Sequence, residues 1–286
     1  MSSPIAVPRS ALHGARSRRP QGFATALGFN FVAAISYPGT GTPPAPLLPH
    51  NRASRTPGDP DLRALLFLSL LALAVWGLVR YLERTRPQDL PWTPLDLAAP
   101  LGRATAWKLA SLEGDPAWCR RLLTLDGVKF EAVPDRTTAP GCGWQGAVKL
   151  TGSEWSPRGP VLTCPMAAAV TVWQRHVVRP AARKHLASNL TRIDHYGTYS
   201  CRTVAGSARQ SQHATSNAID IAAIRTVRGE PISVLRDWNG TPERAAFLRD
   251  IHDGACRVFG TVLGPDYNRA HRDHLHFDLA NWNFCR

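Results

Sequence analysis

The chain has 286 residues, with 34 Lys and Arg against 21 Asp and Glu, which gives a formal net charge of +13. This length allows one or two domains, and the basic excess favours an anionic polymer as partner. Nucleic acid is not the expected polymer, because the arginines are scattered, no nucleic-acid motif occurs, and the cysteine pattern indicates export.

The first unit of the chain, residues 1–61, is a basic and proline-rich arm without cysteine. No helical or alternating apolar pattern persists along it, apart from a short apolar stretch at residues 29–35. Such a segment buries too little apolar surface to offset the entropy lost on ordering. We therefore expect the arm to be largely disordered.

The second unit, residues 62–82, is almost uniformly apolar. Its central part carries no charge, and Arg63 and Arg80 can extend their charged ends to the membrane interfaces. About 20 apolar residues cross a bilayer, so the sequence predicts one transmembrane helix. The lack of a polar face argues against a buried core helix. A cleaved signal peptide is the open alternative, although the segment lies far from Met1.

Residues 83–106 are rich in proline and polar residues, and they are predicted to form a linker that lets the domain stand off the bilayer. The fourth unit, residues 107–286, is the predicted folded domain. Helices are expected in this domain at 115–125, 166–186 and 241–262, and strands at 128–133, 146–150, 193–202, 217–224, 232–238 and 275–279.

All six cysteines follow the apolar segment, and none belongs to a Cys-x-x-Cys unit; they are Cys119, Cys142, Cys164, Cys201, Cys256 and Cys285. Wide and even-numbered spacing favours disulfides in an oxidising compartment, with 15 pairings open; free buried thiols are the alternative. Arginines flank the apolar segment on both sides, so charge does not orient it. The cysteines therefore indicate a single-pass inner-membrane protein whose C-terminal domain lies in the periplasm.

Two of the predicted strands carry a cluster of histidine and aspartate residues. Asp220 lies mid-strand in 217–224, where a buried carboxylate needs a metal or another partner, and His213 precedes it in a polar loop. In the second strand, His274 and His276 are two residues apart and therefore share one face. Imidazoles and a carboxylate in this arrangement suit a mononuclear zinc site with an open position. Two surface strands with ordinary polar residues are the alternative.

The pattern Ser-x-His-x-x-x-x-Ala-x-Asp at residues 211–220, with the later His-x-His, resembles the zinc D-Ala-D-Ala carboxypeptidases and endopeptidases that cut peptidoglycan peptides. The chain more closely resembles bacterial extensin-like C-terminal domain proteins, over roughly Pro91 to Arg286. The motifs that carry this second resemblance are Cys201-Arg202, the His213–Asp220 block, Val234–Trp238 and His271–His276.

The resemblance implies an α+β fold, in which a small antiparallel sheet with flanking helices carries the zinc site. It implies His213, Asp220 and His276 as the zinc ligands, and Asp273 as the acidic residue three positions before the last ligand. The sequence departs from the peptidases at two positions. Ser216 stands where they often have glycine, and Asp273 stands where many have glutamate.

Zinc would lower the pKa of a bound water to about 7, and a positioned carboxylate would accept its proton. We assign that role to Asp273 and assign His274 to stabilising the oxyanion; His274 is the competing candidate for the base. Arg202 is expected to bind a substrate carboxylate as a fork, with a solvated arginine as the alternative. His271 and Asp278 are either supports of the ligands or ordinary surface residues.

The predicted function is a membrane-anchored, periplasmic zinc metallopeptidase that hydrolyses peptide bonds of cell-wall peptidoglycan. Its expected partners are peptidoglycan peptides and the inner membrane, through residues 62–82. The alternative is a non-catalytic wall-binding module that retains the peptidase fold.

Overall fold

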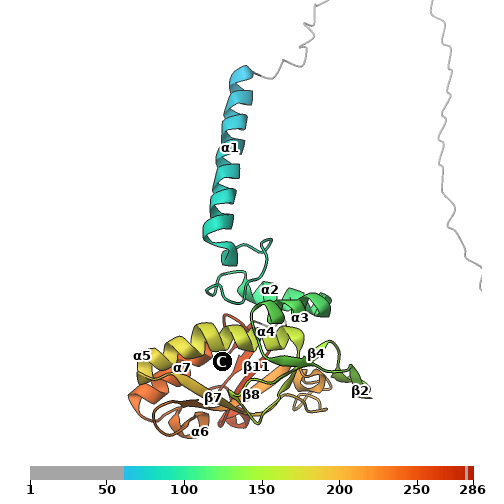
Figure 1. Cartoon of the computed structure of the whole chain (residues 1–286), viewed down its shortest axis with the longest axis vertical. Coiled ribbons are helices and arrows are strands. Elements are labelled where there is room, and N and C mark those ends of the chain that lie inside the picture. Colours follow the sequence, from blue (N-terminus) through green and yellow to red (C-terminus); the bar gives the residue numbers. More distant parts are fainter. Residues whose placement is uncertain (1–60, 281–282) are drawn as a thin grey trace, which may run out of the picture. The chain divides into compact units, whose positions relative to one another are not determined.

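The computed structural model describes residues 61–280 and 283–286 (Figure 1). The predicted disordered arm lies outside the described residues, except for Asp61. Within the described chain the fold is mixed α+β, as predicted.

The apolar segment forms one helix, α1 (Leu62–Thr85), of 24 residues. Asp61 caps its N-terminus by accepting a hydrogen bond from the backbone N–H of Arg63 at 3.1 Å. At 1.5 Å per residue the helix is about 36 Å long, more than the roughly 30 Å of a bilayer core. None of its residues is buried in the structure. By length and composition, α1 is able to cross a membrane.

The segment after α1, which the sequence predicted to be part of a linker at residues 83–106, is bound to the domain and is not an extended tether. Leu97 is 1% exposed and belongs to the core. The buried Lys108 donates from Nζ to the Pro87 carbonyl at 2.9 Å and to Thr93 Oγ1 at 2.8 Å. Because these acceptors satisfy a desolvated ammonium, Lys108 attaches the segment to the domain two residues after α1 ends.

The domain contains several helices. They are α2 (Thr105–Ser111), α3 (Pro116–Leu125), α4 (Cys164–Trp173), a π-helical turn (Gln174–Val178) that continues into α5 (Arg179–Leu186), α6 (Val234–Asp237) and α7 (Pro242–Ala255). Short 3-10 turns occur at Pro87–Asp89, η2 (Leu112–Gly114), η4 (Gln212–Thr215) and Arg269–His271.

The main sheet has seven strands in the order β12-β10-β11-β8-β7-β5, with β9 paired to β8. Its strands are β5 (Trp155–Ser156), β7 (Leu190–Gly197), β8 (Ala218–Thr226), β9 (Ile232–Ser233), β10 (Thr261–Leu263), β11 (Leu275–Asp278) and β12 (Phe284–Cys285). The centre of the sheet is antiparallel, whereas the edge pairs β5–β7 and β10–β12 are parallel.

Two smaller sheets complete the domain. One joins β1 (Phe130–Ala132), β4 (Ala147–Leu150) and β6 (Val161–Thr163), and the other joins β2 (Arg136–Ala139) and β3 (Cys142–Trp144).

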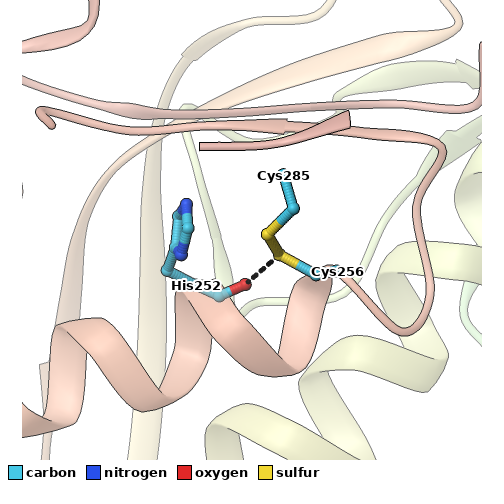
Figure 2. A group of neighbouring side chains, drawn as sticks. All are labelled: His252, Cys256 and Cys285. Carbon is cyan, nitrogen blue, oxygen red and sulfur yellow. Dashed lines mark hydrogen bonds between the residues drawn. A yellow bond between two sulfur atoms is a disulfide. The ribbon is translucent and has the colours of Figure 1, made fainter. Parts of the chain in front are cut away.

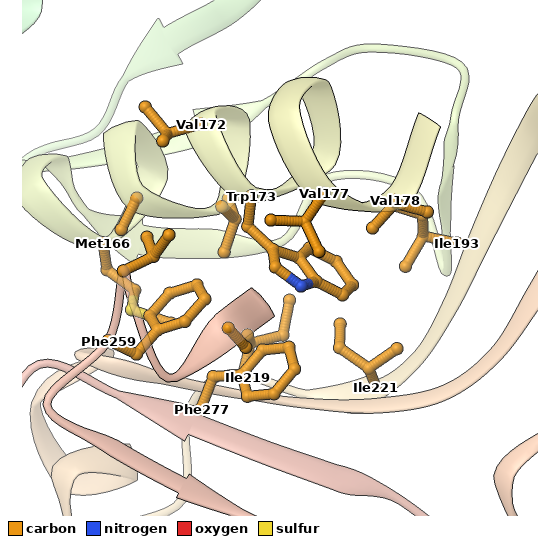
Figure 3. Close-up of a cluster of buried hydrophobic side chains, with 14 of the residues drawn as sticks. Met166, Val172, Trp173, Val177, Val178, Ile193, Ile219, Ile221, Phe259 and Phe277 are labelled. Atoms are coloured by element: carbon orange, nitrogen blue, oxygen red, sulfur yellow. The ribbon is translucent and has the colours of Figure 1, made fainter. Parts of the chain in front are cut away.

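The core lies between one face of the main sheet and helices α4, α5 and α7 (Figures 1 and 3). Trp173 is fully buried; its ring meets Phe277 edge-on at 5.0 Å and its Nε1–H donates to the Ile251 carbonyl at 2.9 Å. Ile219 and Ile221 point into the same core from β8. Because side chains alternate along a strand, Asp220 between them points to the opposite face of the sheet.

Three predicted elements differ from the structure. The strand predicted at 193–202 is β7, which begins at Leu190 and ends at Gly197, a glycine with φ +143°. The predicted strand 232–238 is wrong beyond Ser233, because the Asp237 carboxylate accepts from the Ser233 N–H at 2.7 Å and closes the turn of α6. The helix predicted to reach Val262 ends at Ala255, and β10 follows.

Three disulfides join distant segments, as the cysteine spacing predicted. Cys119–Cys164 links α3 to the start of α4, Cys142–Cys201 links β3 to the loop after β7, and Cys256–Cys285 links the end of α7 to β12. The described chain contains no free cysteine.

The double variant Cys119→Ala/Cys164→Ala should lower the free energy of unfolding by about 2–4 kcal/mol, because losing a cross-link over 45 residues of sequence frees the unfolded chain. Urea unfolding of the detergent-solubilised chain measures this change. An unchanged midpoint and slope would contradict it.

Candidate metal centre

The two predicted strands are neighbours in the main sheet and bring the cluster together. β8 and β11 are antiparallel, with Asp220 directly opposite His276. His213 lies in η4, just before β8, and is 3% exposed. The turn that carries it ends at Ser216, whose φ is +56°. Left-handed backbone of this kind suits glycine, but serine occupies the position in this chain.

Donor atoms of His213, Asp220 and His276 lie within 4.8 Å of one another. His213 Nε2 is 3.2 Å from Asp220 Oδ1 and 3.1 Å from His276 Nδ1, and His276 Nδ1 is 2.9 Å from the same carboxylate oxygen. The structure therefore brings together the three residues that the resemblance implied as ligands.

The other nitrogen of each histidine has a partner that fixes its proton. His213 Nδ1 is 3.3 Å from the Thr198 carbonyl, and His276 Nε2 is 3.0 Å from Asp278 Oδ2. Because a carbonyl and a carboxylate only accept, both of these nitrogens carry the N–H. In the neutral rings, His213 Nε2 and His276 Nδ1 then present lone pairs to each other and to Asp220. Facing lone pairs are unfavourable unless a proton or a cation lies between them.

The charges in the cluster agree with that requirement. Burial opposes a charged imidazole at His276, but hydrogen bonds to Asp220 and Asp278 outweigh it and raise the pKa of His276 to about 9. Burial also opposes ionisation of Asp220, yet hydrogen bonds from His213 and His276 hold its pKa well below the usual range. The cluster thus favours one positive charge beside Asp220, which either a proton on His276 or a metal cation would supply.

The donor set fits zinc. Two imidazoles and one carboxylate are a common ligand set of catalytic zinc sites, which leave a fourth position open. Each histidine also donates its second N–H to an oxygen acceptor, as metal-binding histidines do. This second feature is independent of the three donors.

A second group of metal-binding residue types, formed by His252, Cys256 and Cys285, is not a comparable site (Figure 2). The two sulfurs are joined to each other in a disulfide, and a disulfide sulfur is not the thiolate that binds metal. The ring nitrogens of His252 face other hydrogen-bond acceptors, with Nδ1 2.9 Å from Asp253 Oδ1 and Nε2 3.2 Å from the Arg286 carbonyl.

His274 and Asp273 lie beside the cluster. His274 Nε2 is 3.6 Å from Asp220 Oδ1, so His274 faces the same side of the sheet as His276. Its Nδ1 is 3.0 Å from Asp273 Oδ1. No described residue donates a hydrogen bond to Asp273 Oδ2, and the Asp273 side chain is 28% exposed. One oxygen of this carboxylate is thus held by His274, while the other has no hydrogen-bond donor among the described residues.

The family model for "Extensin-like protein C-terminus" matches residues 117–286, more than half of the chain. The chain belongs to this extensin-like family. No curated protein and no solved structure matches the chain. The matched residues begin after Pro91, where the resemblance starts. The family match does not link the chain to the zinc peptidases, so the relationship to those enzymes stays a prediction.

Arg202 was predicted to end the strand at 193–202, but in the extensin-like domain it lies outside that strand. It follows β7 in a loop, where its carbonyl accepts from the Ser211 N–H at 3.0 Å, and its side chain is exposed. Burial, then the neighbouring His274 and His276, and last the charge of Arg202 lower the pKa of His271 to about 4, against the opposing charge of Asp220. Arg202 therefore lies near the histidines and faces solvent.

The sequence did not decide whether Asp278 and His271 of the extensin-like domain support the candidate ligands or are ordinary surface residues. Asp278 is 6% exposed and binds His276, so it supports a candidate ligand. His271 Nδ1 lies 2.8 Å from Asn268 Oδ1, and its ring centroid is 5.2 Å from that of His274. Thr198 was missed, because its contribution is a main-chain carbonyl that any residue would provide.

Replacing Asp278 with asparagine should weaken zinc binding by about 10–100-fold, because the carboxylate that orients and polarises His276 is lost. The backbone N–H of Ala280 can still donate to the amide oxygen in place of Asp278 Oδ1. Competition with a chromogenic chelator measures the affinity. Asp253→Asn is the matched control, since Asp253 also binds a histidine, at 2.9 Å, but outside the cluster. Equal zinc affinities in both variants would contradict the assignment.

Proposed function

We propose that this chain is a membrane-anchored zinc peptidase that hydrolyses peptide bonds of bacterial peptidoglycan. The observation that carries the proposal is the convergence of His213, Asp220 and His276, with the Thr198 carbonyl and Asp278 holding the outer nitrogens of the two histidines. Buried polar groups are costly unless each one is paired, and a bound cation would pair the facing nitrogens of His213 and His276 with the Asp220 carboxylate.

His213, Asp220 and His276 would hold the zinc. A zinc ion in this position supplies Lewis acidity, which activates a water and polarises a substrate carbonyl. The side chains around it then decide which bond is attacked and how protons move.

Asp273 is proposed to accept the proton of the attacking water through its open oxygen and to return that proton to the leaving amine. His274, held by Asp273 at Nδ1, donates from Nε2 to the developing oxyanion when the ring is protonated. The exposed Arg202 is proposed to bind a carboxylate of the substrate as a fork. Peptidoglycan peptides carry such carboxylates.

The proposed location is the inner membrane, with α1 as a single span and the domain in the periplasm. Three disulfides support an oxidising compartment. Of the formal charge of +13, the first 63 residues contribute +5, and the +8 that remains favours approach of the domain to an anionic wall polymer.

The test is incubation of the zinc-loaded full chain with peptidoglycan fragments, followed by mass spectrometry of the products. We expect shortened peptides whose mass loss identifies the scissile bond. Retention of the fragments without cleavage, in a chain that holds stoichiometric zinc, would replace the proposal with a non-catalytic wall-binding module. A chain with neither zinc nor cleavage would overturn it.

A further inference from the structure

Large apolar side chains are exposed between α1 and β1. Outside α1, the tryptophans exposed among the described residues are Trp92, Trp107 and Trp118, at 61%, 59% and 41%, and Leu125 nearby is 71% exposed. We refer to these four residues as the tryptophan surface. Tryptophan is highly buried on average in soluble domains, so three exposed rings within such a short stretch require an explanation.

The helices α2 and α3 present these residues on their outer faces. α2 buries Thr105, Lys108 and Leu109, which leaves Trp107 outward. α3 buries a second set, consisting of Cys119, Leu122 and Leu123.

The exposed positions of α3 include Trp118, Arg121 and Leu125, which are three and four residues apart and therefore form one face. Both helices pack on α4 and are joined by η2, so their outer faces both point away from α4. A solvent-facing helix surface is normally polar, whereas this one is aromatic and basic.

The tryptophan surface is close to the end of α1 along the chain. α1 ends at Thr85, and the Pro87 carbonyl already accepts from Lys108 in α2. Two extended residues span only about 7 Å. Trp92 is attached to α1 itself, through a 3.1 Å hydrogen bond from Nε1 to Glu83 Oε1. A bilayer crossed by α1 would therefore have its headgroup layer next to α2.

The chemistry of this surface matches that layer. Tryptophan prefers the membrane interface, because its ring is apolar and its N–H is polar. Exposed arginines accompany the tryptophans at Arg84, Arg86, Arg103 and Arg121, and guanidinium groups bind phosphate in pairs of hydrogen bonds.

We propose that the tryptophan surface lies in the phospholipid headgroup layer of the bilayer that α1 crosses. The domain is thereby held against the membrane in one orientation. The inference rests on the proposed membrane anchor and is independent of the proposed catalysis.

The test uses the full chain reconstituted in vesicles of phosphatidylcholine and phosphatidylglycerol, in which part of the lipid carries bromine near the headgroup end of the acyl chains. Bromine quenches tryptophan emission only at contact range. Trp107→Phe/Trp118→Phe preserves an aromatic, apolar surface and removes two reporters. We expect the quenched part of the emission to fall in this variant and to stay unchanged in Trp238→Phe, a control at a ring that is 4% exposed.

Trp76→Phe, in the middle of α1, reports on the anchor separately, in vesicles whose lipid carries bromine near the end of the acyl chains at the bilayer centre. Quenching lost in Trp76→Phe but unaltered in Trp107→Phe/Trp118→Phe would overturn this inference and leave the anchor intact. Quenching unaltered in both would overturn the anchor as well. The single variant Trp92→Phe repeats the measurement with an independent reporter if the double variant does not fold.

Discussion

Replacing His213 with alanine should remove stoichiometric zinc from the purified protein and abolish peptide cleavage. His213 supplies one of three converging donors, and its Nε2 lies 3.1 Å from His276 Nδ1. The variant keeps two protein donors, one fewer than the three that catalytic zinc sites have. Elemental analysis after dialysis against a weak chelator measures the metal content.

The matched control is His185→Ala. His185 is likewise a histidine paired with an aspartate, with Nε2 2.7 Å from Asp250 Oδ2, but it is only partly buried and lies on α5. Its loss should leave the zinc content at the wild-type level. Because His213 is buried, circular dichroism must first show that His213→Ala is folded. A folded His213→Ala that keeps wild-type zinc would sink the assignment of this cluster as the metal centre.

The sequence predicted the facing of Asp220 and His276 for a specific physical reason, whereas their role as zinc ligands stays a prediction. Side chains on a strand alternate between faces, so the neighbours of Asp220 and His276 indicate which way each of them points. Ile219, Ile221 and Phe277 are fully buried in the core. This alternation, with the antiparallel pairing of Asp220 and His276, was sufficient to bring the donors onto one face.

Elements governed by local polar contacts were harder to predict. Residues 232–238 contain apolar and β-branched residues that resemble a strand, but Asp237 accepts from the Ser233 N–H and makes them a helical turn. The proline-rich segment after α1 resembles a free linker, but Lys108 binds it to the domain. Neither contact follows from hydrophobic periodicity, because each depends on one polar side chain reaching a particular backbone group.

The pairing of the cysteines also could not be predicted from the sequence. Six cysteines allow 15 pairings, and only the tertiary structure shows that α3 meets the start of α4, where Cys119 and Cys164 join. Membership of the extensin-like family does not reduce that number on its own. The α+β fold class could therefore be predicted from the sequence, and the resemblance named the three residues that the structure groups. The disulfide pairing and the supporting main-chain carbonyl of Thr198 could not be predicted.

Asp273→Asn should retain zinc and lose roughly 10²–10⁴-fold in turnover, the usual effect of removing a positioned acid–base group. The asparagine oxygen can still accept from His274 Nδ1, which lies 3.0 Å from the carboxylate in the wild type. The position of His274 should therefore be preserved, and the lost activity would report on the proton acceptor alone. Turnover is measured on the peptidoglycan fragment identified by mass spectrometry, beside the zinc content of the same sample.

His274→Ala is the informative companion, because His274 Nε2 lies 3.6 Å from Asp220 Oδ1 and is the other group able to move a proton here. If His274 only stabilises the oxyanion, its loss should retain zinc and reduce turnover less than Asp273→Asn does. A nearly normal Asp273→Asn beside an inactive, zinc-loaded His274→Ala would reverse the roles. Asp273 would then serve to orient His274 through Nδ1, and the lone pair on Nε2 would accept the proton.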